Sequence, residues 1–363
     1  MIGRTLGFYI ASRFAKTVLT MMVSLLAFIV LVDFIEQLRK GAERPELATL
    51  SLLQLSVLKA PIFLDKAFPF ACLFAAMITL TQLNQKMELV VARAAGVSAW
   101  QFLMPASAAA IFIGLFAALV YNPMAVVAFN SSKDLEALLF SGVDRMKQAE
   151  PSVYWVRQED SGGSSVINAR LARNRGQRLD DVKVLRFDEN NALYERIDAA
   201  NAIFINNGWR FENAVVTGPD ALSQQHERFD IDSKLSVDTL EGVTASPDSV
   251  GFWGLPAIAA KAALSGINPG AYQVQFQSLL ALPLFLVAMV LIAATVSLRF
   301  VRFGQVGRMI LGGIISGFVL YTVTKLVTSL GSNGIVPPAV AAWSPSVVAI
   351  VFGISILLHQ EDG

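Results

Sequence analysis

The chain has 363 residues, of which 54% are hydrophobic and only 16% are charged, and its mean hydropathy is +0.54. Soluble domains carry roughly 25% charged residues, so this composition excludes an ordinary water-soluble protein and indicates that much of the chain lies in lipid. The formal net charge of +1 gives no global basic field of the kind that nucleic-acid binding needs.

Six membrane spans are predicted from the intervals between charged residues, because a spanning helix needs about 20 mostly apolar residues. They are expected at about 14–36, in a region that ends with the uncharged run 67–85, at 101–122 with an end at Asn122-Pro123, and at about 276–298, 309–330 and 338–358. No small-residue cleavage site follows the basic N-terminus, so the first run is interpreted as an uncleaved span. Pro61 and Pro69 near the second span, and Pro283 in the fourth, are expected to kink those helices.

The segment 123–268 differs from its surroundings, because it holds 20 of the 28 acidic and 15 of the 29 basic residues and no apolar run of spanning length. Short, often alternating segments predict strands at 152–157, 165–171, 182–187, 192–199, 202–205, 209–216 and 227–231. Asn190-Asn191 and Asn207-Gly208 are turn signals, and the second is typical of a hairpin. We therefore predict a mixed membrane protein: helices in 1–122 and 269–363 flank an antiparallel β sandwich or jelly-roll-like domain.

Basic residues in short segments predict the orientation of the spans. They are Arg4, Arg13 and Lys16 at the N-terminus, Lys86 and Arg93 in the second loop, and Arg299, Arg302 and Arg308 in the fourth. These segments are placed in the cytoplasm, so both termini are cytoplasmic and the strand-rich insert lies outside. Arg39, Lys40 and Arg44 between the first two spans are exceptions, because the rule would not place them outside.

Enzymatic chemistry lacks its usual parts in this sequence. His226 and His359 are the only histidines and are far apart in sequence, so neither an H-E-x-x-H zinc site nor a histidine-based triad is present. No Gly-Lys dipeptide occurs, which excludes a Walker A loop and leaves any ATP chemistry to a partner. Cys72, the only cysteine, excludes an intrachain disulfide and is interpreted as a small buried apolar residue.

Residues 84–96 predict a short amphipathic helix on the cytoplasmic side, ended by Gly96, which suits a C′ cap. Small residues such as Ala92 permit close approach of another protein, while Glu88 and Arg93 offer charge pairing. This is the form of a coupling helix that docks into a nucleotide-binding subunit. An ordinary interfacial loop helix with solvated charges is the alternative.

Several segments resemble the LptF/LptG permease family of the lipopolysaccharide export ABC transporter, and its LptG members more than its LptF members. Residues 88–96, Glu-Leu-Val-Val-Ala-Arg-Ala-Ala-Gly, are similar to the cytoplasmic signature of that family. Residues 33–40, Asp-Phe-Ile-Glu-Gln-Leu-Arg-Lys, resemble the end of its first span, and 317–321 and 334–338 are similar too. With the three-plus-three layout, the resemblance covers essentially the whole chain.

The resemblance implies a transport subunit, not an enzyme, in the inner membrane of a Gram-negative bacterium. It would pair with LptF, bind an LptB dimer that holds ATP and Mg, and pass lipopolysaccharide through LptC to the LptA bridge toward the outer membrane. This chain would have no cofactor of its own, and its insert would be the periplasmic β-jelly-roll. The residues that couple to the ATPase would be Glu88, Ala92, Arg93 and Gly96.

The resemblance also implies a lipid cavity in which cations meet the phosphates of lipid A. Arg39 and Lys40 match basic positions of the family at the outer end of the first span, and Phe68 matches an aromatic in the outer part of the second. These three are lipopolysaccharide-binding candidates. For the two cations the alternative is snorkelling to headgroups, with Glu36 and Lys40 as an i,i+4 pair.

Asp33 and Lys325 complete the lipopolysaccharide-binding candidates. Asp33 stands where LptG sequences can carry lysine. Lys325 lies near the same outer level of the fifth span, so two interpretations stay open: a pair between Asp33 and Lys325, and snorkelling of Lys325, which is supported at least as well. Two other functional classes stay open: a scaffold that presents the β domain, and an ion-coupled transporter with Asp33, Asp65, Lys66 and Lys325 as a relay.

Overall fold

The computed structural model divides into two compact units, which are described separately. The helical unit comprises Met1–Leu139, Gly251–Trp253 and Gln273–Gly363, and the sheet unit comprises Phe140–Val250 and Gly254–Tyr272. The structure describes residues 4–42, 48–94, 96–140, 154–160, 163–173, 177–188, 192–205, 208–219, 223–233, 246–264, 268–297 and 306–361. Arg44, Asn190, Asn191, Asn207, Arg299 and Arg302 lie outside these residues, as do the side chains of Arg93 and Arg308.

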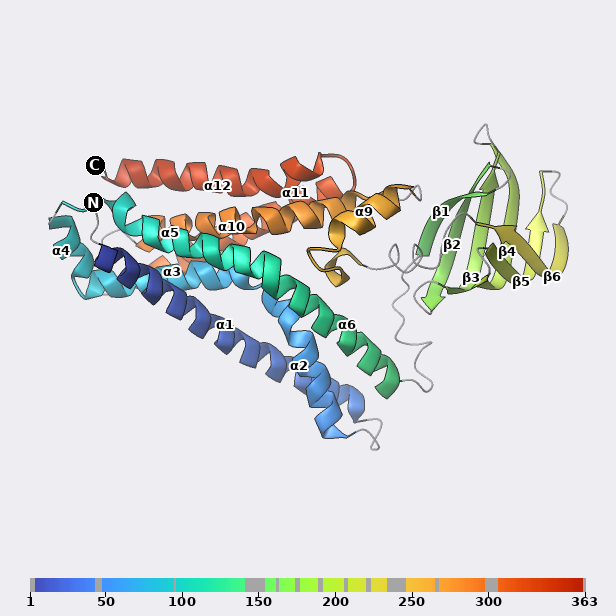
Figure 1. Cartoon of the computed structure of the whole chain (residues 1–363), viewed down its shortest axis with the longest axis horizontal. Coiled ribbons are helices and arrows are strands. Elements are labelled where there is room, and N and C mark those ends of the chain that lie inside the picture. Colours follow the sequence, from blue (N-terminus) through green and yellow to red (C-terminus); the bar gives the residue numbers. More distant parts are fainter. Residues whose placement is uncertain are drawn as a thin grey trace. The chain divides into compact units, whose positions relative to one another are not determined.

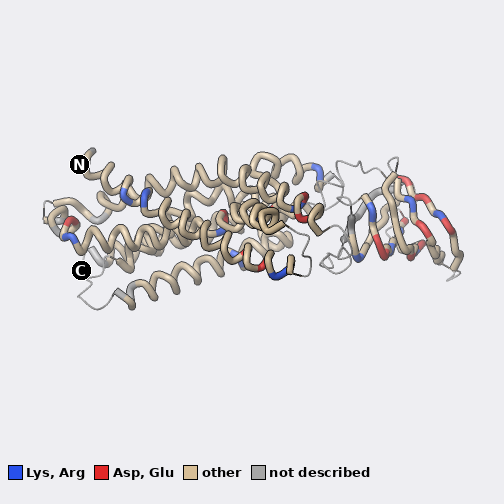
Figure 2. Tube along the Cα trace, turned by 90° about the horizontal axis from the view of Figure 1, so that it is seen from below, with Lys and Arg blue, Asp and Glu red and all other residues tan. Residues whose placement is uncertain are grey.

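Long apolar helices build the helical unit. In the described part of the chain they are α1 (Arg4–Gly41), α2 (Thr49–Asp65), α3 (Phe68–Gln85), the short α4 (Glu88–Ala94), α5 (Ala99–Phe116), the π turn η1 (Ala117–Tyr121), α6 (Asn122–Leu139), α10 (Gly270–Ser297), α11 (Val306–Ser332) and α12 (Pro338–Glu361). Five helical segments among the described residues are long and apolar enough to span a membrane, or six if the bent pair α2–α3 is one span. The start of α1, the end of α12 and α4 lie at one end of this unit (Figure 1). Figure 2 shows few charged residues along these helices and many on the strands.

The predicted kink near the second span is a sharp bend, since α2 and α3 meet at 68°. Lys66 caps α2, and Pro69 lies in the first turn of α3, where its missing N–H removes no helical hydrogen bond. Pro283, in contrast, lies inside α10, which continues as one helix of 28 residues. The bend therefore occurs where a helix can restart, and Pro283 alone does not end its helix.

The third predicted span does not end at Asn122-Pro123, because the helix continues through η1 and α6 to Leu139. Proline usually ends a helix because it cannot donate to the carbonyl four residues earlier, which here belongs to Leu119. The indole N–H of Trp253 donates to the Leu119 carbonyl at 3.1 Å and takes the place of that missing donor. The sequence prediction was wrong because the compensating donor is distant in sequence.

Asn122, at the same junction, links three parts of the helical unit. Its side-chain amide donates to the Asp65 carboxylate at 2.9 Å, and its amide oxygen accepts from the Phe252 backbone N–H at 3.1 Å. The residue is only 2% exposed, so these bonds satisfy polar atoms that water does not reach. The bend after Asp65, the π turn and residues 251–253 are thus held together.

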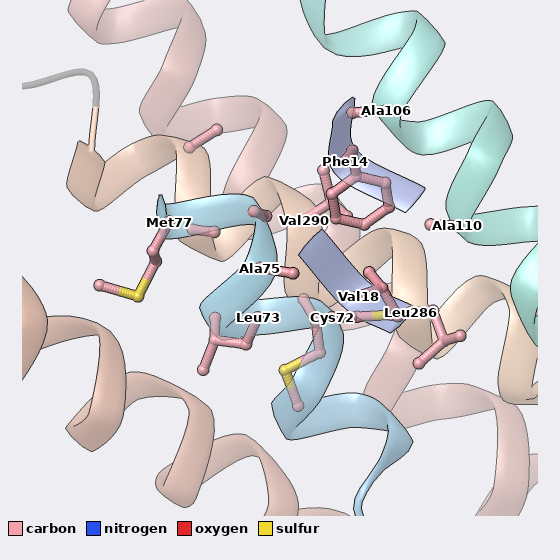
Figure 3. Packing of buried hydrophobic residues seen from close by; sticks show 14 of the residues in the cluster. Phe14, Val18, Cys72, Leu73, Ala75, Met77, Ala106, Ala110, Leu286 and Val290 are labelled. Atoms are coloured by element: carbon pink, nitrogen blue, oxygen red, sulfur yellow. The ribbon is translucent and has the colours of Figure 1, made fainter. Parts of the chain in front are cut away.

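Small residues allow close packing between the helices. Phe14 and Val18 of α1 belong to a buried cluster with residues of α3, α5 and α10, and Figure 3 shows the Phe14 ring close to Ala106 and Ala110 of α5. Cys72 lies in the same cluster and is fully buried, which confirms its interpretation as a buried apolar residue. Apolar packing and close backbone approach thus hold these helices together.

Gly114 of α5 gives a testable case of this packing. A β-carbon there would lie 2.5 Å from the Cα of Pro283, a backbone atom of α10 that has no side-chain freedom to move away. We expect Gly114→Ala to destabilise the helical unit by about 1–3 kcal/mol, the usual cost of overpacking. Gly312→Ala is the matched control, because its β-carbon would meet only Val296 Cγ1 at 3.6 Å. Thermal unfolding in detergent should show a lower Tm for Gly114→Ala alone; equal Tm values would contradict the packing.

The sheet unit contains one six-stranded antiparallel sheet among the described residues. Its strands are β1 (Tyr154–Asp160), β2 (Gly163–Arg173), β3 (Arg178–Phe187), β4 (Leu193–Ile205), β5 (Gly208–Thr217) and β6 (Ser223–Asp232), paired in chain order; η3 (Pro247–Ser249) and α9 (Leu255–Leu264) follow. Consecutive order is that of a meander, whereas a jelly roll needs strands that cross between two sheets. The antiparallel β domain is therefore confirmed, and the jelly-roll arrangement is not.

A row of irregular residues crosses this sheet. Regular pairing skips Arg170, Asp181, Ala200, Asn213 and Glu227, which lie side by side on β2 to β6, and Asp181 and Asn213 have left-handed φ angles of 53°. On β3 to β5 every second side chain is buried, and this alternation shifts by one residue at the row. Each strand therefore bends there, and the same face of the sheet stays apolar on both sides of the bend. The row also explains why 192–199 and 202–205, predicted as two strands, form the single strand β4.

Candidate functional site

The predicted cytoplasmic helix forms as α4, between α3 and α5. Met87, with a left-handed φ of 60°, makes the turn from α3. At the other end Gly96 has a φ of 82°, and the N–H of Val97 donates to the carbonyl of Ala92 at 3.0 Å, the 6→1 bond of a Schellman motif. The C′ role predicted for Gly96 is therefore confirmed, and α4 has defined ends.

Glu88, the first residue of α4, contacts two side chains of α1. The Arg13 guanidinium of α1 lies 3.5 Å from the Glu88 carboxylate and donates to the Tyr9 hydroxyl at 2.7 Å. The Tyr9 hydroxyl in turn donates to Glu88 at 3.4 Å, and the second Arg13 Nη donates to the Gln82 side chain of α3 at 3.1 Å. Arg13 is thus the side chain that links α1 to both α3 and α4, and Glu88 is its contact on α4.

The rest of α4 has one side anchored and one side open. Leu89 is buried in the helical core at 5% exposure, which fixes the inner side of the helix. Ala92 is half-buried, Val91 is 67% exposed and Glu88 keeps a third of its side chain accessible. A short helix with an accessible side that carries Glu88 and Val91 and a side anchored by Leu89 leaves one surface open to a protein partner.

Arg39 and Lys40 lie at the opposite end of α1 from Glu88. Both contact one carboxylate, that of Glu36, with Arg39 at 2.9 Å and Lys40 at 3.7 Å. The i,i+4 pair considered from the sequence is therefore present, but a single carboxylate leaves one excess positive charge. The Arg39 side chain is 77% exposed and Lys40 37%, so both remain accessible to an anion.

The structure does not bring Asp33 and Lys325 together. Among the described residues no ion pair joins them: Asp33 accepts from the Gln37 amide at 3.4 Å, four residues along α1, and Lys325 lies 5.7 Å from the ring centre of Tyr321 on its own helix. Of the two interpretations left open by the sequence, the pair is therefore not formed among the described residues, and each residue has its contact one helical turn away on its own helix. Lys325 lies about two turns before the end of α11, the end opposite α4.

Phe68 is not an exposed contact either. It is 5% exposed and packs edge-on against Tyr121, with ring centres 5.1 Å apart. In this chain the ring packs behind the bend at the start of α3, and its contact with lipid stays a prediction. Sequence reasoning also missed the partners of Glu88. Arg13 counted only as a positive charge in a terminal segment, and no local pattern places it beside residue 88.

Comparison with known proteins decides the family. The family model described as lipopolysaccharide export system permease LptF/LptG matches residues 8–359. The chain belongs to the LptF/LptG permease family. The lipopolysaccharide export system permease protein LptG of Escherichia coli K12 is 24% identical over 359 residues, covering 97% of this chain and 98% of that protein. The LptG protein of Haemophilus influenzae is 22% identical over 369 residues, covering 99% of each.

Membership confirms the resemblance drawn from residues 33–40, 88–96, 317–321 and 334–338. An LptF/LptG permease with five or six apolar helices and an antiparallel β domain is a multi-pass inner-membrane transport protein. In the part of the chain that the structure describes, no group of three or more His, Cys, Asp or Glu could hold a metal ion. The site to be explained is therefore α4 at one end of the bundle and the cations at the other.

Proposed function

We propose that this chain is the permease subunit of an ABC transporter that extracts lipopolysaccharide from the inner membrane. A partner ATPase would drive it, and the lipid would pass to a periplasmic bridge toward the outer membrane. The observation that carries the proposal is α4: a capped helix with one side in the core and Glu88 accessible at its start. Such a helix suits docking into a nucleotide-binding subunit.

The orientation follows from the basic residues. With α4 and both chain ends in the cytoplasm, Arg39, Lys40 and Lys325 lie toward the periplasm, and α2–α3 counts as one bent span among six. The β unit then lies in the periplasm, where its bent antiparallel sheet, apolar on one face, would hand lipid onward.

The partners follow from the family. The sister permease is LptF, the ATPase is an LptB dimer that binds ATP and Mg, and LptC and the LptA bridge receive the lipid. The described helices leave large apolar side chains exposed along α1 and α11, such as Phe28, Leu31, Phe318 and Leu326, which suits contact with lipid or a second permease. Co-purification tests these partners: an ATPase and a sister permease should follow this chain through detergent solubilisation, and their absence would count against the proposal.

Arg39 and Lys40 are expected to bind the phosphates of lipid A, because their shared carboxylate leaves them one net positive charge. In the double variant Arg39→Gln/Lys40→Gln, photo-crosslinking of lipopolysaccharide from the first span should fall by about a hundredfold or more, since hydrogen bonds to charged groups contribute about 1.5–3 kcal/mol each. Lys16→Gln, an exposed cation at the other end of α1, is the matched control. Unchanged crosslinking in the double variant would show that the two cations only snorkel.

A further inference from the structure

The hydrogen bonds of Arg13 to Tyr9 and Gln82 are shorter than the contacts that Arg13 and Tyr9 make with Glu88. Arg13 is held firmly by Tyr9 on its own helix, at 2.7 Å, and by Gln82 on α3, at 3.1 Å. Its contact with Glu88, and that of the Tyr9 hydroxyl, are at 3.5 and 3.4 Å, the long limit of a hydrogen bond. Arg13 is thus a fixed cation, and Glu88 is a carboxylate that rests against it loosely.

Arginine is suited to this position because its guanidinium is planar and has several donors. One Nη reaches Tyr9 and Glu88 while the other reaches Gln82, so a single side chain links α1, α3 and α4. The Arg13 side chain is only 18% exposed, which limits screening by solvent. Lysine has its three donors on one nitrogen, so it lacks the two separated Nη atoms with which Arg13 reaches Gln82 on one side and Tyr9 and Glu88 on the other.

The helix that carries Arg13 also carries the cations at the far end. α1 is one uninterrupted helix of 38 residues, and Arg13 and Arg39 are separated by about 39 Å along it, at 1.5 Å per residue. A displacement of α4 that acts through Glu88 on Arg13 would therefore move the element that bears Arg39 and Lys40. No described loop interrupts the path between them.

We propose that Arg13 is a positioning residue that couples α4 to the first span, so that movement of the docked helix is transmitted to α1. The inference rests on the proposed function and adds the residue through which the ATPase acts on the lipid-binding end. Tyr9 and Gln82 hold the guanidinium in place. Glu88 has two roles, one toward the partner and one toward Arg13, and its loose contact lets both operate.

The test uses the whole purified complex in proteoliposomes and measures lipopolysaccharide released per ATP hydrolysed. Arg13→Gln should still co-purify with the ATPase and hydrolyse ATP, but should release about five- to tenfold less lipid per ATP, within the usual range of coupling between sites. Tyr9→Phe, which keeps the ring and removes the hydroxyl, should lower the ratio less. Lys16→Gln should leave it unchanged.

Four results would overturn the proposed role of Arg13. A wild-type ratio in both Arg13→Gln and Tyr9→Phe would overturn the role of Arg13 while leaving the proposed function intact. Loss of ATPase co-purification in Arg13→Gln would also overturn it, because Arg13 would then serve docking and not transmission. If the wild-type chain itself recruits no ATPase, the proposed function fails and the inference fails with it. Full restoration by Arg13→Lys would show that charge alone suffices and would refute the three-helix link.

Discussion

Glu88→Arg is expected to abolish stable recruitment of the partner ATPase. The substitution removes the accessible carboxylate of α4 and places a second guanidinium where Arg13 already lies 3.5 Å away. Loss of one member of a charged interface pair costs about 2–5 kcal/mol, so the affinity should fall by about 30-fold or more. Both the unpaired partner cation and the repulsion from Arg13 act in the same direction.

The measurement is quantitative co-purification from detergent, titrated with purified ATPase. Glu88→Gln keeps the shape of the side chain and should lose less affinity than Glu88→Arg. Lys86→Gln, at an exposed position two residues earlier, controls for a change of charge near the helix. If Glu88→Arg binds the ATPase as the wild type does, α4 does not dock through this carboxylate.

Trp209→Ala is expected to cause the largest loss of stability in the sheet unit. The side chain is fully buried, lies on β5 opposite Phe204 and Ile231 of the neighbouring strands, and packs edge-on against Phe204 with ring centres 5.1 Å apart. Truncating a buried aromatic residue costs about 3–5 kcal/mol through lost burial and the cavity left behind. The apolar face of β4 to β6 would lose its largest member.

Hydrogen exchange of the backbone amides of β4 to β6, measured on the full chain in detergent, checks this prediction. Exchange through opening of the unit should accelerate by about 150-fold or more, which corresponds to at least about 3 kcal/mol. Leu193→Ala, a 55% exposed apolar residue on β4, is the control and should change exchange little. Equal protection in both variants would mean that Trp209 is not a core residue.

The features that the sequence predicted correctly depend on local patterns. The apolar helices follow from gaps between charges, and the end of α4 follows from a glycine that tolerates a positive φ. The β domain follows from the alternation of apolar and polar residues, although the two strands predicted on either side of Ala200 form one strand. The family was predicted from residues 33–40, 88–96, 317–321 and 334–338, and the family model, which matches residues 8–359, confirms it.

The features that the sequence could not predict depend on partners distant along the chain. Pro123 is a helix end in any local reading, yet the Trp253 indole supplies the donor that lets the helix continue. Asp33 and Lys325 have opposite charges and were placed at a similar depth in the membrane, but the rotation of each helix decides which side chains meet. Each residue contacts a side chain one turn away on its own helix. The contacts of Arg13 with Gln82 and Glu88 likewise join residues about 70 positions apart, which no local pattern indicates.

The central claim is that ATP hydrolysis by a partner drives lipopolysaccharide out of the membrane through this permease. It is tested most directly by reconstituting the co-purified complex with lipopolysaccharide in proteoliposomes and measuring lipid released to a soluble acceptor. We expect release of lipopolysaccharide that requires ATP and Mg and continues after proton and sodium gradients are abolished. Release that proceeds without ATP and stops when a gradient is abolished would contradict it.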